Sequence, residues 1–187
     1  DGMVLHAGTI PQEPGDAGKL ADYSRVIGSA KEWGGLCNCT PTLEVFDGTL
    51  PEAPGAKASS MIQGPCFFGG CSELCVESEF RVSKPHSAKR IGDVAIIKKL
   101  RPRTFSDFCQ ELCTDSDRYY IQFIDPTLTP QQKATLMGSL MLSDYMFFEQ
   151  DNGMVDCSHN QVTITCCMYY WGGCLCPCKC VLRGNDG

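Results

Sequence analysis

The chain has 187 residues, which is the length of about one domain and is enough to bury a hydrophobic core. Its formal net charge of −6 argues against a nucleic-acid-binding protein, because such proteins normally carry a basic surface. Charged residues make up 20% and hydrophobic residues 43% of the chain, and this composition excludes wholesale disorder. Cysteine is the unusual residue, with 14 copies.

The composition changes along the chain and predicts three regions. Residues 1–19 are expected to form an extended arm or linker, because Pro11, Pro14 and several glycines interrupt any periodic pattern. Folded character begins directly after this arm, and one folded unit is expected over residues 20–150. Residues 151–187 hold many of the cysteines and are expected to form a cysteine-rich extension.

Several short stretches alternate apolar and polar residues with the period of two that is typical of half-buried strands. The predicted strands are residues 41–46, 76–82, 92–97, 118–124 and 161–165. Glycine and proline separate many of them. Short strands at such close spacing predict a mainly β fold, either a barrel or a sandwich.

One helix is predicted over residues of about 130–149. Thr129 can cap it, Pro130 fits the first helical position, and Gln132 completes a capping box. The helix is apolar on nearly every face, so it must be enclosed by protein or lipid. It is too short and too interrupted by polar residues to be a membrane span. In a mainly β chain the inside of a barrel would enclose it, and Gly138 would let a wall approach closely.

Four motifs resemble one known family. They are Met61-Ile-Gln-Gly-Pro-Cys66 followed by Cys71, the strand 78–82, the acidic segment 114–117, and Asp144-Tyr-Met-Phe-Phe-Glu149 at the end of the helix. Together they resemble the second half of the phospholipid scramblase domain. The resemblance covers about residues 26–149, and the motif at the end of the helix is the most specific.

The resemblance implies a partial tubby-like β-barrel around a buried C-terminal apolar helix, followed by the cysteine-rich extension. In that helix it singles out Gly138, Asp144, Phe147 and Phe148. It also implies a membrane-associated protein, at an organellar or cytoplasmic membrane face, that contacts membrane lipids. The implied activity is movement of phospholipids between leaflets, in which no bond is made or broken.

The N-terminal barrel strands of the family have no counterpart in this sequence. An open barrel leaves strand edges and one flank of the helix exposed. We therefore expect an N-terminal segment or another protein subunit to complete the barrel, and a strand near residues 162–170 to close it in part. The alternative function is an accessory subunit of a larger membrane assembly, which uses the scramblase-like fold for docking.

A calcium site is expected at Asp115, Asp117 and Asp125, the first two of which lie in the acidic segment that resembles the family. Carboxylate oxygens are the ligands that calcium prefers. The segment departs from a standard calcium loop, since Tyr120 and Pro126 occupy the positions where glycine and glutamate are needed. The alternative is an acidic turn before a strand.

The extension carries a cluster of six cysteines: Cys166, Cys167, Cys174, Cys176, Cys178 and Cys180. Three interpretations stay open. Beside several aromatic and aliphatic residues the thiols suit reversible acylation, which anchors a protein firmly when several chains are attached. They could instead bind zinc as thiolates, although the spacing is unusually dense for zinc. In an oxidising compartment they could form disulfides.

The chain has one basic cluster, formed by Lys98, Lys99, Arg101 and Arg103. Such a cluster can contact anionic lipid headgroups. The alternative is a solvated turn.

Overall fold

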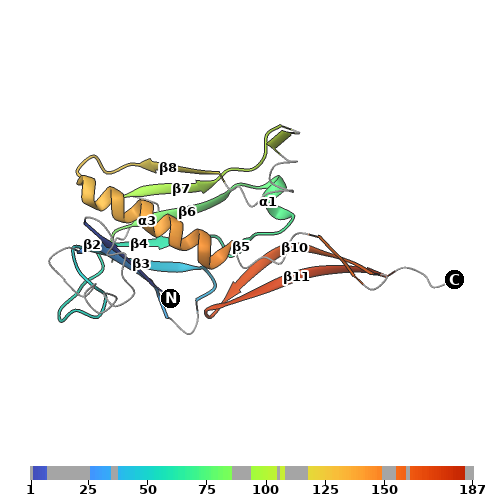
Figure 1. The fold of residues 1–187 in the computed structure, drawn as a ribbon, viewed down its shortest axis with the longest axis horizontal. Helices are drawn as coiled ribbons and strands as arrows, with labels where there is room; N and C mark the ends of the chain where they lie inside the picture. The colour runs from blue at the N-terminus through green and yellow to red at the C-terminus, as the bar shows by residue number, and fades with distance from the viewer. Residues whose placement is uncertain are drawn as a thin grey trace, which may run out of the picture.

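The computed structural model describes residues 2–7, 26–34, 38–85, 94–104, 106–107, 118–148, 155–158 and 161–183. Most of its strands form one antiparallel sheet, sheet A, which curls into a half-barrel (Figure 1). The order along sheet A is β1 (Gly2–His6), β2 (Val26–Glu32), β3 (Thr42–Asp47), β4 (Ser60–Gln63), β6 (Ser78–Ser83), β7 (Ala95–Lys99) and β8 (Tyr119–Phe123). The predicted mainly β half-barrel with one C-terminal helix is confirmed.

Alternating side chains give sheet A a buried face. In β6, Ser78, Phe80 and Val82 are buried, and the residues between them are half-buried or exposed, as the period of two predicts. Residues 2–6 of the predicted arm are strand β1, which pairs with β2. Within the described residues β1 and β8 are the two edges of the sheet.

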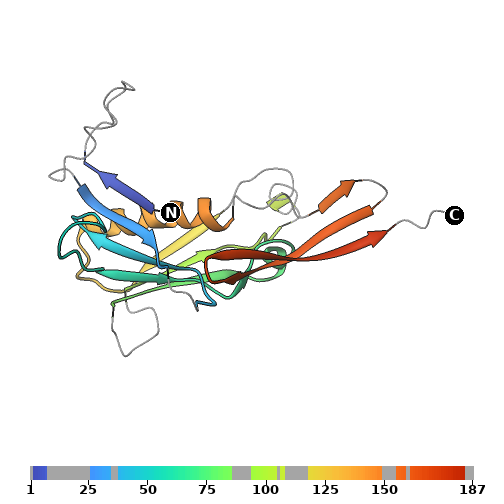
Figure 2. The same ribbon diagram turned by 90° about the horizontal axis from the view of Figure 1, so that it is seen from below.

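Helix α3 (Pro130–Phe147) lies across the inner face of sheet A (Figure 2). Its predicted capping box is present: the Gln132 backbone N–H donates to the Thr129 side chain, and the Thr129 backbone N–H donates to the Gln132 side chain. Close packing against β2 requires a glycine, because a Cβ at Gly28 would lie 2.3 Å from Oγ1 of Thr135. This contact fixes how near the helix approaches the sheet.

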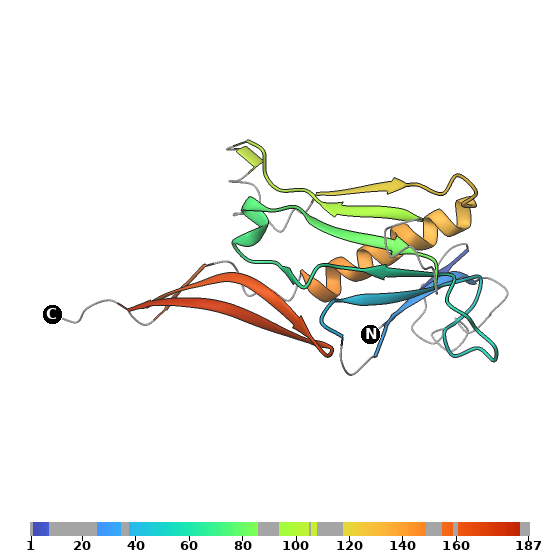
Figure 3. The ribbon, with the colours of Figure 1, turned by 180° about the vertical axis from the view of Figure 1, so that it is seen from behind.

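The C-terminal extension supplies three of the four strands of a second sheet, sheet B, that runs away from the half-barrel (Figure 3). It contains β5 (Phe67–Phe68), β9 (Val155–Ser158), β10 (Gln161–Trp171) and β11 (Cys174–Arg183). The long β10–β11 hairpin turns at Gly172 and Gly173, whose positive φ angles of 54° and 88° suit a two-residue hairpin turn.

The additional strand that we expected near residues 162–170 is therefore present as part of β10. It pairs with β5, β9 and β11, and not with either described edge of sheet A, so the expectation that it closes the barrel is wrong. The physical reason is local pairing, because β9 and β11 are the neighbours of β10 in sequence and both pair with it. The predicted domain limits at residues 20, 150 and 151 lie outside the described residues and stay predictions.

The turn of the hairpin is attached to the half-barrel. The backbone N–H of Gly172 donates to the carbonyl of Asn38, and the Tyr170 hydroxyl donates to Oε1 of Glu32 at 2.8 Å. Tyr170 is buried and meets Phe147 edge-on with ring centroids 6.1 Å apart. The aromatic core thus joins the end of α3 to the base of the extension. A short helix, α1 (Ser72–Cys75), follows β5.

Candidate functional site

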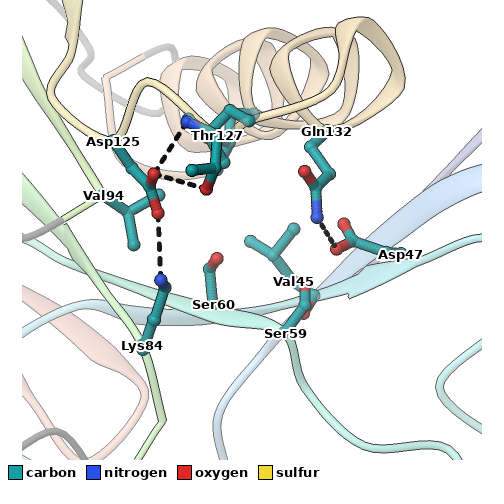
Figure 4. Close-up of a pocket in the computed structure, with 11 residues that line it drawn as sticks. Val45, Asp47, Ser59, Ser60, Lys84, Val94, Asp125, Thr127 and Gln132 are labelled. Carbon is teal, nitrogen blue, oxygen red and sulfur yellow. Dashed lines mark hydrogen bonds and ion pairs between the residues drawn. The ribbon is translucent and has the colours of Figure 1, made fainter.

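A small polar cavity of about 100 Å³ lies between the start of α3 and sheet A (Figure 4). Its lining includes Asp47, Lys84, Asp125, Thr127 and Gln132. Gln132 donates from Nε2 to Oδ2 of Asp47 at 2.8 Å, so the capping residue also ties the helix to β3. Lys84 contacts Oδ2 of Asp125 at 2.9 Å across the same cavity.

Asp125 is one of the three predicted calcium ligands, and its carboxylate already has cationic and hydroxyl partners. The Thr127 hydroxyl donates to Oδ1 at 2.6 Å, and this bond and the Lys84 ammonium lower the pKa of Asp125 from 3.8 to about 2. A cation at Asp125 would have to compete with Lys84. Asp115 and Asp117 lie outside the described residues, so the calcium site stays a prediction.

The outward face of α3 forms an apolar stripe at the surface. Met137, Met141 and Tyr145 are spaced four residues apart and are 53%, 68% and 64% exposed. The opposite face is buried and includes Leu136, which is 2% exposed. The helix is thus covered on one side by sheet A and open on the other, as expected for an incomplete barrel.

The residues singled out in α3 occupy different places around it. Gly138 faces the edge strand β1, since a Cβ there would lie 3.0 Å from Cε of Met3. Asp144 accepts a 2.6 Å hydrogen bond from the Tyr119 hydroxyl. Phe147 and Phe148 are buried in the aromatic core. Two of these residues therefore fill the core, and the other two contact strands at opposite edges of sheet A.

Sequence reasoning missed a buried ion pair. Lys99 is only 5% exposed, contacts Glu73 at 2.5 Å and lies 4.1 Å from the ring centroid of Phe148. The expectation that Lys99 belongs to a surface cluster with Lys98 is wrong for this residue. Successive residues of a strand face opposite sides of the sheet, and Lys99 is on the inner side. The alternation along β7, which places Lys99 on the same side as Ala95 and Ile97, was the sequence signal that could have predicted its burial.

The β10–β11 hairpin gathers its cysteines on one face, which we call the thiol face. Cys174, Cys176, Cys178 and Cys180 alternate along β11 and therefore point to the same side. On β10 the register shifts between Thr165 and Cys167, as in a β-bulge. Cys167 lies directly opposite Cys178, and the Sγ atoms of Cys166 and Cys180 are 3.4 Å apart. The bulge thus brings both consecutive cysteines to the thiol face.

Aromatic side chains continue the thiol face toward the turn. Tyr169 lies opposite Cys176 and Trp171 lies opposite Cys174. Tyr169 stacks on Trp171 with centroids 6.3 Å apart and contacts Phe67 of β5 at 5.3 Å. Phe67 and Trp171 are both more than half exposed, so this end of the face is apolar and open to solvent.

The six predicted thiols differ in their surroundings. All four on β11 are exposed, and Cys166 and Cys167 are half-buried. A hydrogen bond with Cys180 raises the pKa of the Cys166 thiol, and burial raises the pKa of the Cys167 thiol. In the part of the chain that the structure describes, no three histidine, cysteine or carboxylate side chains are grouped to hold a metal ion. Zinc binding stays a prediction.

A family model described as Scramblase matches residues 26–150, which is more than half of the chain. The chain belongs to the scramblase family. The resemblance seen in the sequence motifs is therefore confirmed. The matched segment of this scramblase-family chain contains sheet A from β2 onward together with α3, the polar cavity and the apolar stripe.

Two curated relatives show how far the similarity extends. The chain is 33% identical over 93 residues to phospholipid scramblase 2 of Bos taurus, which is 49% of this chain and 28% of that protein. It is 31% identical over 90 residues to phospholipid scramblase 1 of Mus musculus, which is 48% of this chain and 24% of that protein. The matches thus span about a quarter of the length of these relatives. No solved structure matches significantly.

Among the helices that the structure describes, none combines the length and the apolar character needed to cross a bilayer. The apolar stripe of α3 and the aromatic end of the thiol face are two exposed apolar surfaces of the described chain.

Proposed function

We propose that this chain associates with membranes and moves phospholipids between leaflets without making or breaking bonds. The observation that carries the proposal is the family match over the half-barrel and α3. The similarity to proteins named phospholipid scramblases supports phospholipid as the lipid class. Movement of a lipid needs a surface that accepts acyl chains while the headgroup stays in a polar environment.

The apolar stripe of α3 is the surface that we assign to acyl chains. Met137, Met141 and Tyr145 give it an apolar row along the helix that no described strand covers. Methionine is flexible and polarisable, which suits contact with ligands of variable shape. Removing such apolar area from water supplies the driving force for contact with a bilayer.

We further propose that Cys174 and Cys176 are acylation points that strengthen membrane association. Both thiols are exposed and lie opposite the Trp171 and Tyr169 rings, at the apolar end of the thiol face. Aromatic residues of this kind favour the membrane–water interface. Two acyl chains at this place would anchor the protein far more firmly than one.

The test of lipid movement uses the purified chain in vesicles of phosphatidylcholine and phosphatidylserine that carry a fluorescent phospholipid in both leaflets. Dithionite, which destroys only outer-leaflet fluorescence, should remove nearly all of the signal if the lipid moves, and only the outer-leaflet share if it does not. Replacing Met137, Met141 and Tyr145 by serine should slow the loss. The matched control, Tyr120→Ser on the exposed side of β8, should not.

The same assay separates the remaining alternatives. A rate that rises with added calcium and loses this response in Asp115→Asn with Asp117→Asn would support the calcium prediction. Vesicle binding without any lipid movement would contradict the proposed activity, but it would support the proposed association with membranes. Absence of both vesicle binding and lipid movement would contradict the proposal and favour the accessory-subunit alternative.

The mass of the native chain tests acylation of the extension. A mass increase that hydroxylamine removes should disappear in Cys174→Ser with Cys176→Ser, and persist in Cys157→Ser.

A further inference from the structure

Four cysteines of the thiol face form two cross-strand pairs. Cys166 and Cys180 have their sulfur atoms 3.4 Å apart, and Cys167 lies directly opposite Cys178 in the β10–β11 ladder. Opposed residues of an antiparallel ladder have Cα atoms about 4.5–5.5 Å apart, which falls within the range that a disulfide bridges, so the ladder itself places Cys167 and Cys178 for a bridge. Cys166 and Cys180 are not opposed in the ladder, because Cys180 lies opposite Ile164. For this pair the short separation of the two sulfur atoms indicates that a bridge can form.

The bulge in β10 is what creates the double pairing. In a regular strand, two consecutive cysteines would point to opposite sides of the sheet, and only one could meet a cysteine of β11. The register shift between Thr165 and Cys167 removes this alternation at one point. Cys174 and Cys176 differ from the four paired residues, since they lie opposite aromatic side chains.

We propose that Cys166–Cys180 and Cys167–Cys178 are two redox-active dithiols that form disulfides by exchange with a low-molecular-weight disulfide such as oxidised glutathione. The inference concerns the hairpin alone and does not rest on lipid movement. Closure of both pairs would cross-link the middle of the hairpin, between the turn that is attached to the half-barrel and the end that projects from it (Figure 3).

The exchange starts at an exposed sulfur and ends at its neighbour. The thiolate of Cys180, which is exposed, attacks one sulfur of oxidised glutathione, and one glutathione thiolate leaves. The sulfur of Cys166 then attacks the Cys180 sulfur of this mixed disulfide, and the second glutathione thiolate leaves. Two protein thiols are oxidised, one glutathione disulfide is reduced, and the two protein protons end on the two glutathione thiols. Cys178 and Cys167 react in the same way.

The exposed position of the β11 thiols makes the reaction reversible. Excess reduced glutathione can reach the same sulfur atoms and reverse both steps. In the reduced state, a hydrogen bond with Cys180 raises the pKa of the Cys166 thiol, and the two sulfur atoms are 3.4 Å apart. Cys166 then lies beside the sulfur that it must attack.

The test equilibrates the full reduced chain with oxidised glutathione, blocks the remaining thiols with an alkylating reagent, and maps disulfides by mass spectrometry. Cleavage after Tyr169, Trp171 and Lys179 by chymotrypsin and trypsin separates the two β10 cysteines from the β11 cysteines, and isolates Cys180 on its own peptide. We expect a Cys166–Cys180 link and a Cys167–Cys178 link as the main products. Reduced glutathione should return both to free thiols.

Variants assign each link without depending on a disulfide for folding. Cys166→Ser should leave Cys180 alkylated and keep the Cys167–Cys178 link. Cys167→Ser should leave Cys178 alkylated and keep the Cys166–Cys180 link. Cys176→Ser is the matched control, because it removes a β11 thiol that faces Tyr169 and should leave both links intact. Far-UV circular dichroism of each variant checks that the strands are retained.

Three results would overturn the proposal. Cys180 could be recovered fully alkylated from the wild-type chain after oxidation. The Cys180 link could persist in Cys166→Ser, which would show a different partner. Cys166 could be linked mainly to Cys71, whose backbone N–H donates to the carbonyl of Thr165 and which therefore lies near β10. The exposed Cys157 on β9 serves as an internal control, because its cross-strand neighbour is Val162.

Discussion

The half-barrel and the hairpin extension are both regular antiparallel structures, but they are stabilised differently. Sheet A buries Leu43, Val45 and Val82 almost completely beneath α3. Along β11, by contrast, nine of the ten residues are exposed and only Leu175 is half-buried. Since removal of apolar area from water dominates folding free energy, the half-barrel carries most of the stabilisation.

The hairpin depends on its ladder and on its attachment to the half-barrel. An isolated two-stranded hairpin is only marginally stable in water, so contacts at its turn end, where it meets the half-barrel, must contribute to its stability. Tyr170 and Met168 on β10 are buried, and β10 pairs with β5 at Phe67 and Phe68. The comparison teaches that substitutions should have large effects in the half-barrel and at this junction, and small effects along the projecting end.

The largest effect is expected at the buried ion pair. Lys99→Ala leaves the Glu73 carboxylate, which is only 12% exposed, without this ammonium and should lower the free energy of unfolding by about 3–5 kcal/mol. Replacing both residues, Lys99→Met with Glu73→Leu, should recover most of the loss. Urea denaturation measures each variant. Lys98→Ala is the control, because its exposed pair with Glu79 should contribute no more than about 1 kcal/mol.

The second-largest effect on stability is expected from the difference between the buried and the exposed face of α3. Leu136→Ala creates a cavity in the core and should cost about 2–5 kcal/mol. Met137→Ala, one residue further on the outward stripe, should change stability by less than about 0.5 kcal/mol. Leu182→Ala at the projecting end of the hairpin should be as mild, since this side chain is 60% exposed. Equal losses for Leu136 and Leu182 would contradict the comparison.

The junction should show an intermediate effect. Tyr170→Phe removes the hydroxyl that donates to Glu32, and a hydrogen bond to a charged group contributes about 1.5–3 kcal/mol. Burial and the same contact raise the pKa of the Tyr170 phenol, so the hydroxyl stays a donor across the physiological range. Thermal unfolding measures the loss. Trp171→Phe, on the exposed side of β10, should be nearly neutral.

The smallest effect concerns acid stability. The pKa of Asp125 is lowered from 3.8 to about 2, so its contribution is fully present above the ordinary value and is lost as the pH falls through about 2. Asp125→Asn should therefore reduce the dependence of stability on pH in this window. Denaturation curves at several pH values measure the change, and an unchanged dependence in Asp125→Asn would contradict the prediction.

Local patterns predicted several elements well. The capping box located the start of α3 at Pro130, because Thr129 and Gln132 satisfy backbone groups within a few residues of themselves. The period of two predicted the buried face of β6. The hairpin was only half predicted: its first strand was recognised, but the alternating cysteines of β11 were read as a chemical cluster and not as a strand.

The candidate sites depended on partners that are distant in sequence. Asp125 was predicted from its own residue type, but Lys84 is 41 residues away, and no local pattern indicates the contact. The buried Lys99–Glu73 pair depends in the same way on how α1 packs against β7. The six thiols were all identified, but their division into pairs and unpaired positions follows from the bulge in β10.

Residue types, short-range spacing and local hydrogen bonding were enough to predict a mainly β chain, the helix and the cysteine cluster. The motifs predicted the family, and the resemblance to that family implied the half-barrel. Packing in three dimensions was needed to show which face of α3 is exposed, that Lys99 is buried, that the extension pairs with β5 in a separate sheet, and which thiols meet. Each of these properties depends on the register between strands and on packing between distant segments. A register shift of one residue would turn the side chains of a strand to the opposite face of the sheet.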